Sequence, residues 1–141
     1  MSANQSEIYR VDVEITAPVY DTEVTSRVAD AVTNIFPNAE LEESLGEIRG
    51  ETHSLEQFSD LLHRQEILDT ARGEFFSSRE AETFSFALKK QAAFENRVNF
   101  SVGEPDELGE IAVRVRVDEP TVEEYVDHVA PPTEDGRPID S

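Results

Sequence analysis

Residues 8–19, IYRVDVEITAPV, alternate apolar and polar side chains along most of their length. Val11, Val13 and Ile15 fall on one face of an extended chain, and polar residues fall on the other. This period of two is typical of a strand with one buried face. Pro18 ends the predicted strand, because proline cannot donate to the hydrogen-bond ladder of a sheet.

Three later segments show the same alternation and are predicted to be strands. Their apolar positions are Phe84, Phe86 and Leu88, then Val98, Phe100 and Val102, and finally Ile111, Val113, Val115 and Val117. A turn near Glu95 and Asn96 joins the first two strands, and residues 103–109, GEPDELG, form a loop before the third. Two shorter strands, residues 39–45 and 47–53, are separated by Gly46, which favours a hairpin.

Two short segments carry apolar residues at helical spacing. The first helix is expected to begin at Asp21 or Thr22 and to continue to about Phe36, just before a Pro-Asn pair. The second lies near the C-terminus and has Pro120 at its first position. Its apolar residues are Val122, Tyr125, Val126 and Val129.

The longest predicted helix lies between these two. Ser54 and Gln57 form a capping-box pattern at its start, and the helical spacing continues to Phe75. The apolar residues that make its predicted buried stripe are Leu55, Phe58, Leu61, Leu62, Leu68, Ala71 and Phe75.

The resulting order, β-α-β-β-α-β-β-β-α, predicts an α+β fold. Alternating groups of strands and helices indicate a two-layer sandwich, with a mainly antiparallel sheet and helices on one face. We expect a single domain over residues 8–130, because the chain shows no internal repeat and has 141 residues. Residues 1–7 are expected to be a disordered N-terminus, and residues 131–141 a disordered acidic tail.

The chain is strongly acidic, with 31 Asp and Glu residues against 12 Lys and Arg residues and a formal net charge of −19. In ordinary cytosol this charge destabilises a small domain by self-repulsion, whereas ~1 M salt shortens the Debye length to ~3 Å and screens it. Because the acidic residues are spread over the whole chain, we interpret it as a cytoplasmic protein of a halophile. The alternative is an acidic protein from a low-salt cell that binds a basic partner.

Several classes of function lack their sequence signatures. No apolar run approaches the ~20 residues of a membrane span, and the first residues do not form a secretory signal. The chain has no cysteine, and His53, His63 and His128 are not spaced as metal ligands. No nucleophile or phosphate-loop motif is present. We therefore predict no enzymatic activity, no cofactor, no metal, no membrane partner and no small-molecule substrate.

Residues 64–100 differ in charge from the rest of the chain. They contain six cations and six anions, so the remaining residues carry the whole net charge of −19. A polyanion meets the least repulsion on this segment. It also holds Lys89 and Lys90, the only two lysines. If the predicted strand continues in phase, Lys90 lies on its core side and reaches Glu66 or Asp69 of the long helix, while Lys89 faces solvent.

One face of the predicted long helix is polar beside the apolar stripe. Gln65, Asp69 and Arg72 share this face because they stand at positions i, i+4 and i+7. One interpretation is an Asp69–Arg72 pair within the helix. The other is a polar surface that Gln65 and Arg72 form with the strand residues Lys89 to Gln91.

Three longer strings resemble an archaeal protein family that is described as predicted RNA-binding proteins or predicted exosome subunits. They are HSLEQFSDLLHRQEILDTAR (53–72), LKKQAAFENRVNF (88–100) and LGEIAVRVRV (108–117), within a resemblance that covers residues 9–131. The resemblance implies a two-layer α+β fold like that of the ribosomal protein that binds five-S RNA. Asn96 stands where a glycine is expected in the family, and asparagine also tolerates a left-handed turn.

We predict a non-catalytic RNA-associated domain, an accessory of RNA processing or degradation. The residues expected to contact phosphates are Lys89, Lys90, Arg97, Arg64 and Arg72. Gln91 and Asn99 would hydrogen-bond bases or sugars, and Phe94 would stack on a base. The alternative is a protein-interaction or dimerisation module that docks through an exposed sheet face or edge, without direct contact to RNA.

Overall fold

The computed structural model of the protein describes residues 9–102, 109–134 and 137–138. The expected disordered N-terminus, most of the expected loop at 103–109 and part of the expected tail lie outside these residues. Within the expected tail, β6 (Thr133–Glu134) pairs antiparallel with β7 (Arg137–Pro138). All other helices and strands lie between Arg10 and Val129.

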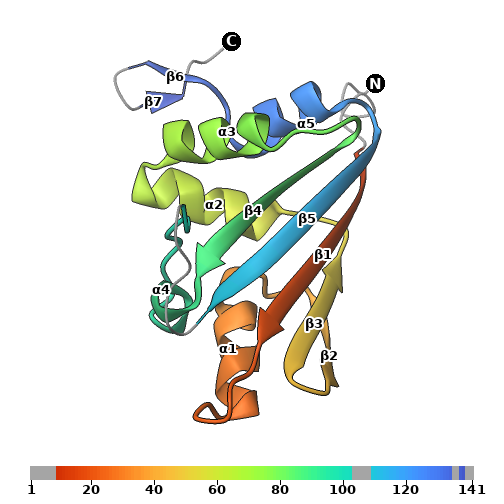
Figure 1. Ribbon diagram of the computed structural model, residues 1–141. Coiled ribbons are helices and arrows are strands. Elements are labelled where there is room, and N and C mark those ends of the chain that lie inside the picture. The colour runs from red at the N-terminus through yellow and green to blue at the C-terminus, as the bar shows by residue number, and fades with distance from the viewer. Residues whose placement is uncertain (1–8, 103–108, 135–136, 139–141) are drawn as a thin grey trace.

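Five antiparallel strands form the central sheet in the order β2-β3-β1-β5-β4. The strands are β1 (Arg10–Pro18), β2 (Glu40–Ser44), β3 (Glu47–Thr52), β4 (Thr83–Lys89) and β5 (Glu110–Glu119). β1 lies at the centre of the sheet (Figure 1), where Val13 is opposite Thr52 of β3 and Val115 of β5. The predicted α+β fold with an antiparallel sheet is confirmed.

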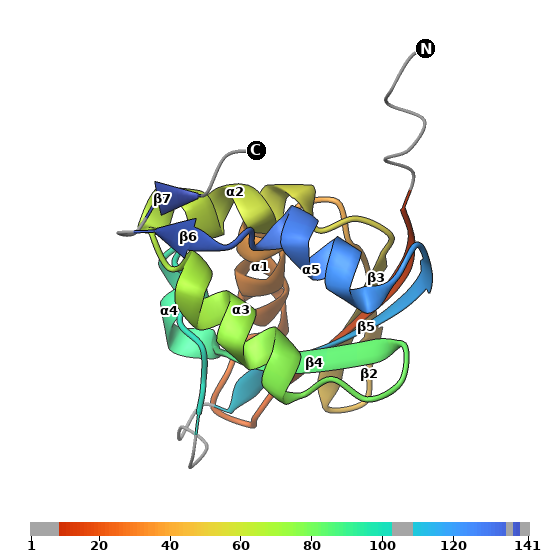
Figure 2. The same cartoon turned by 90° about the horizontal axis from the view of Figure 1, so that it is seen from above.

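The alternating strand residues give the sheet one buried face and one open face. On β1, Val13 and Ile15 are buried, whereas Arg10 and Glu14 are exposed on the other side. The helices are α1 (Thr25–Ile35), α2 (Glu56–Gln65), α3 (Leu68–Ser77), α4 (Lys90–Phe94) and α5 (Val122–Val129). Figure 2 shows α2, α3 and α5 packed together on one side of the sheet, as expected for a two-layer sandwich.

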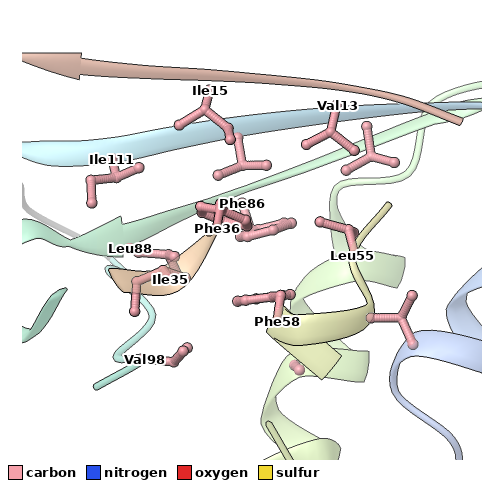
Figure 3. Packing of buried hydrophobic residues seen from close by; sticks show 14 of the residues in the cluster. Val13, Ile15, Ile35, Phe36, Leu55, Phe58, Phe86, Leu88, Val98 and Ile111 are labelled. Carbon is pink, nitrogen blue, oxygen red and sulfur yellow. The ribbon is translucent and has the colours of Figure 1, made fainter. Parts of the chain in front are cut away.

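Aromatic rings join the two layers of the core. The Phe58 ring of α2 stacks on Phe36, which follows α1, at 5.3 Å between centroids, and on Phe86 of β4 at 5.2 Å. Figure 3 shows Phe58 and Leu55 lying beneath the apolar side chains of the sheet. Burying one such ring stabilises the fold by about 1.5–3 kcal/mol, so these contacts hold the helical layer on the sheet.

The single long helix predicted from Ser54 to Phe75 is wrong, because α2 and α3 are separate helices. α2 ends just before Glu66, which has a left-handed φ of 60°, and the N–H of Ile67 donates to the Leu62 carbonyl oxygen at 3.1 Å. The break has a physical reason in the apolar pattern. Leu62 and Leu68 are six positions apart, which is not a whole number of helical turns, yet both are buried.

The strand predicted over residues 98–102 is reduced to one isolated bridge between Phe100 and Leu88. The Lys89 N–H donates to the Asn99 carbonyl oxygen, and the Ser101 N–H donates to that of Ala87, both at 2.8 Å. Only the last residues of β4, Ala87 to Lys89, pair with this segment, since α4 begins at Lys90. Asn96 has a left-handed φ of 64°, so the turn expected there is confirmed.

The predicted starts of two helices also differ from the structure. α1 begins at Thr25 after Val24, without a side-chain cap, instead of at Asp21 or Thr22. α5 is capped by Thr121, whose Oγ1 accepts from the Glu124 N–H at 3.1 Å, instead of starting at Pro120. The hairpin at Gly46 is confirmed, with a φ of 81° that favours glycine.

Candidate nucleic-acid interface

Lys90 is fully buried, with 0% relative exposure. Its Nζ donates to the Pro18 carbonyl oxygen at 2.6 Å and to Glu23 Oε1 at 2.9 Å, and lies 4.9 Å from the centroid of the Tyr20 ring. Lys90 lies on the core side, as predicted, but it is the first residue of α4 and not a continuation of the strand. The ammonium is used inside the fold, so Lys90 is not accessible to a phosphate.

Glu66 and Asp69, the partners predicted for Lys90, do not contact it. Both are exposed on the helical layer, and Asp69 Oδ1 accepts a hydrogen bond from Thr133 Oγ1. The prediction fails because Lys90 begins α4, which packs beside α1, and its side chain meets the β1–α1 loop. The lysine therefore joins the end of the sheet to the start of α1.

Gln65, at the end of α2, forms two hydrogen bonds with the backbone of Val98. Its Nε2 donates to the Val98 carbonyl oxygen at 2.9 Å, and its Oε1 accepts from the Val98 N–H at 2.8 Å. The side chain thus supplies the pairing that a neighbouring strand would give. These bonds place the end of α2 beside the segment that contains Arg97 and Asn99.

Arg72 joins α3 to the C-terminal helix instead of facing solvent. Its Nη1 lies 2.7 Å from Asp127 Oδ1 and donates to the Ala130 carbonyl oxygen at 3.1 Å. Its guanidinium also lies over the Phe76 ring, 5.1 Å from the centroid. Neither interpretation of the polar helix face is correct for Arg72: it is not paired with Asp69, and it forms no surface with the lysine strand.

The other predicted RNA contacts lie at the surface around α4. Gln91, on α4 itself, is exposed, as are Arg97 and Asn99 after it and Arg64 at the end of α2. Lys89 is half-buried at the end of β4, opposite Glu110 in the sheet register. The structure therefore brings these five residues to one end of the molecule and removes Lys90 and Arg72 from it.

Most cations of the described residues are neutralised by a carboxylate within 4.0 Å. These paired side chains are Arg10, Arg49, Arg72, Arg79, Lys90 and Arg116. Among the side chains that the structure describes, the cations without such a carboxylate are Arg27, Arg64, Lys89, Arg97 and Arg114. Arg114, within β5, lies on the open face of the sheet, and Lys89, the last residue of β4, lies at the end of that face next to α4.

The unpaired cations other than Arg114 all lie close to α4. Arg97 follows this helix and Lys89 precedes it, while the Arg27 guanidinium lies over the Phe94 ring at 5.9 Å from the centroid. Arg64 is next to the Gln65 amide that binds the same segment. We define the α4 surface as the residues Arg27, Arg64, Lys89, Gln91, Phe94, Arg97 and Asn99. It is the part of the described surface where positive charge is least neutralised.

Arg27 is not among the residues predicted from the sequence to bind RNA, and its contact with Phe94 was not predicted. The two residues are 67 positions apart, so no local spacing connects them. They meet because α1 and α4 pack side by side, and the Asn34 Nδ2 donates to the Ala93 carbonyl oxygen at 2.9 Å. The local signal is limited to Arg27 itself, an exposed arginine on the polar face of α1.

The open face of the sheet has a different character. Glu51 of β3 is opposite both Glu40 and Glu14 in the register, so three carboxylates form one row. A hollow of about 350 Å³ beside this row is lined by Arg114 and Arg116 and by Asp12, Glu14, Glu51 and Thr83. No aromatic side chain stands on the open face of the described strands, so this sheet does not offer stacking platforms for bases.

Other kinds of site find no support in the described part of the chain. No group of three or more His, Cys, Asp or Glu side chains there is arranged to hold a metal ion. No helix within the described ranges is long and apolar enough to cross a membrane. His63 Nδ1 lies 2.8 Å from the Ser59 carbonyl oxygen of its own helix, and His128 pairs with Glu56.

Curated relatives of the chain come from archaea. A UPF0200/UPF0201 protein of Archaeoglobus fulgidus is 40% identical over 130 residues, which cover 92% of this chain and 40% of that protein. A UPF0201 protein of Methanopyrus kandleri is 39% identical over 141 residues, which cover 90% of this chain and 89% of that protein. The chain thus spans less than half of the first relative and most of the second.

Solved structures share the fold. The crystal structure of a UPF0201 protein from Methanococcus jannaschii has a TM-score of 0.84 and 36% identity, with 92% of this chain and 99% of that chain covered. A second UPF0201 structure has a TM-score of 0.81 and 38% identity, with 91% and 99% covered. The family model described as RNA binding matches residues 12–118. The chain therefore belongs to the archaeal UPF0201 family, whose model carries this RNA-binding description.

Proposed function

We propose that the protein binds RNA without catalysing a reaction, and that the α4 surface is the binding site. The observation that supports this most strongly is the grouping of four unpaired cations around α4 in a chain with a net charge of −19. Carboxylates neutralise most of the other cations. A polyanion therefore meets the least repulsion on the α4 surface. The RNA-binding description of the family agrees with this proposal.

Each residue type on the α4 surface has a role in this proposal. Arg64, Lys89 and Arg97 contact phosphates, and the amides of Gln91 and Asn99 hydrogen-bond bases or sugars. Lys90 and Gln65 do not touch RNA and instead hold α4 and the 97–99 segment in place. Because counterion release contributes little in molar salt, hydrogen bonds and stacking must supply much of the affinity there.

The spread of acidic residues supports a working environment of high salt, and the family resemblance supports a place beside the RNA-processing or RNA-degrading machinery. Recovery of the full-length chain from a high-salt lysate tests the second point. We expect RNA to come with it, together with exosome-like proteins. Recovery of the chain without RNA and without exosome-like proteins would contradict a role beside the RNA-processing or RNA-degrading machinery.

The binding test uses fluorescence anisotropy of a labelled single-stranded RNA in KCl solutions. The double variant Arg64→Gln, Arg97→Gln removes two phosphate contacts, so the slope of log affinity against log salt should become shallower by about 1.4. Arg114→Gln is the matched control, because it removes an unpaired cation from the open sheet face. Equal effects of the two variants would contradict the α4 surface as the site.

A protein-interaction or dimerisation module is the second candidate, because the edge of the sheet at β2 is open. This edge carries the exposed carboxylates Glu40, Glu42 and Glu43, which oppose pairing with a second copy. Light scattering at high salt, with and without bulk RNA, separates the two candidates. A dimer whose mass is indifferent to RNA would favour this second function.

A further inference from the structure

A hollow of about 330 Å³ lies between α1 and α4, within the α4 surface defined above. Its lining residues are Arg27, Asp30, Thr33, Asn34 and Phe94. α1 and α4 pack against each other, and Figure 1 shows both at the same end of the molecule. The volume lies at the lower end of the ~300–1,000 Å³ typical of small-ligand sites.

Two features of the sequence build this hollow. Arg27, Asp30 and Asn34 stand at positions i, i+3 and i+7, so they share one face of α1. Asn34 then holds α4 against this face through its hydrogen bond to the Ala93 carbonyl oxygen. Phe94, the next residue, packs partly on the core, so its ring is fixed with one side toward the hollow.

The two charged side chains of the hollow, Arg27 and Asp30, form no ion pair with the described residues. They are neighbours on the helix, but they are not within 4.0 Å of each other. Arg27 instead covers the Phe94 ring at 5.9 Å. The hollow thus combines an aromatic face, a planar cation and a free carboxylate.

Proteins use groups of these three types to recognise an unpaired nucleobase. Bases of single-stranded RNA stack on aromatic side chains and on guanidinium planes, and their Watson–Crick edges are then hydrogen-bonded. A carboxylate only accepts hydrogen bonds. Guanine presents two adjacent donors, N1–H and the N2 amino group, whereas adenine, cytosine and uracil each place an acceptor beside their donor.

We propose that this hollow binds an unpaired guanine of single-stranded RNA. The base inserts between the Arg27 guanidinium and the Phe94 ring, and Asp30 accepts from its N1–H and N2–H groups. Arg27 moves outward to admit the base, as its long side chain allows. The inference rests on the proposed RNA-binding function. It adds that the α4 surface selects guanine.

The test compares labelled eight-nucleotide RNAs that are uridine throughout, or carry one central guanine, adenine or cytosine. The wild-type protein should bind the guanine-containing RNA about tenfold more tightly than the others. Asp30→Asn replaces one acceptor by a donor and should abolish this preference. Phe94→Leu keeps the apolar volume but removes the ring, and should weaken binding of the guanine-containing RNA toward the affinity for uridine alone.

The variant Arg64→Gln, Arg97→Gln separates this inference from the proposed function. It should weaken binding of all four RNAs by a similar factor and leave the guanine preference intact. Wild-type binding without a guanine preference, or a preference that survives Asp30→Asn, would overturn the guanine site while RNA binding stands. If none of the four RNAs binds, the proposed function fails and the guanine site fails with it.

Discussion

The α4 surface and the open face of the sheet both carry cations, but they differ in how these cations are neutralised. On the open face, Arg49 lies 2.6 Å from Glu47, and Arg116 lies 3.1 Å from Asp118. Around α4, no carboxylate of the described residues lies within 4.0 Å of Arg27, Arg64, Lys89 or Arg97. In an acidic chain, the informative quantity is therefore the neutralisation of each cation, and not the number of cations on a surface.

The two regions also differ in what supports them. The open face is held by regular hydrogen bonding between strands. The α4 surface instead depends on Lys90, whose side chain is completely buried beneath it. Glu23, its partner, has only 8% side-chain exposure, and its Oε2 has no hydrogen-bond partner among the described atoms. The α4 surface is thus more sensitive to single substitutions in its support than the open face is.

Lys90→Ala is expected to have the largest effect on stability. It leaves the Glu23 carboxylate buried without its cation, which should lower the free energy of unfolding by about 3–5 kcal/mol. Lys89→Ala, the matched control at the adjacent surface position, should change it by less than about 0.5 kcal/mol. Thermal unfolding in 2 M KCl measures both, and equal losses would show that the two lysines are not divided between core and surface.

Gln65→Ala is expected to have the second-largest effect. It leaves both backbone groups of the buried Val98 without their partners, at a cost of about 1–3 kcal/mol. Because the same bonds position Arg97 and Asn99, RNA affinity should fall as well. Denaturant unfolding gives the stability, and hydrogen exchange should show faster exchange at the Val98 amide. An unchanged exchange rate would contradict the role of Gln65.

Glu51→Gln should have the smallest effect, and it tests the open face. Glu51 is opposite Glu40 and Glu14, so removing its charge should stabilise the protein by about 0.2–1 kcal/mol in dilute buffer. The gain should vanish in ~1 M KCl, where charges are screened. Glu95→Gln, beside the α4 surface, is the control and should not stabilise. A gain that persists in high salt would show that charge repulsion is not its cause.

The strands could be predicted from the sequence because their signal is local. Val13 and Ile15 alternate with polar residues, and a strand with one buried face requires this period. The break between α2 and α3 was harder to predict, since neither glycine nor proline marks it. Its signal is the shift of phase between Leu62 and Leu68, which a continuous helix cannot bury on one face.

The only part of the candidate site that the sequence could predict was the division of Lys89 and Lys90 between surface and core. Lys89 faces away from the core because it continues the alternation of β4, and Lys90, the next residue, is buried as the first residue of α4. The partner of Lys90 could not be predicted, because Glu23 is 67 positions away and meets it only through the packing of α4 against the β1–α1 loop. Arg27 and Phe94 meet for the same kind of reason. The halophilic source and the likeness to the five-S RNA-binding ribosomal protein stay predictions.

The central claim is that RNA contacts the α4 surface and not the open face of the sheet. The most direct measurement is a titration of the isotope-labelled protein with short single-stranded RNA, followed by amide nitrogen–proton correlation spectra in high salt. We expect shifts at the amides of Arg27, Arg64 and residues 89–99, and none at Glu14, Glu51 or Arg114. Shifts confined to the open-face amides, or no shifts at saturating RNA, would contradict the claim.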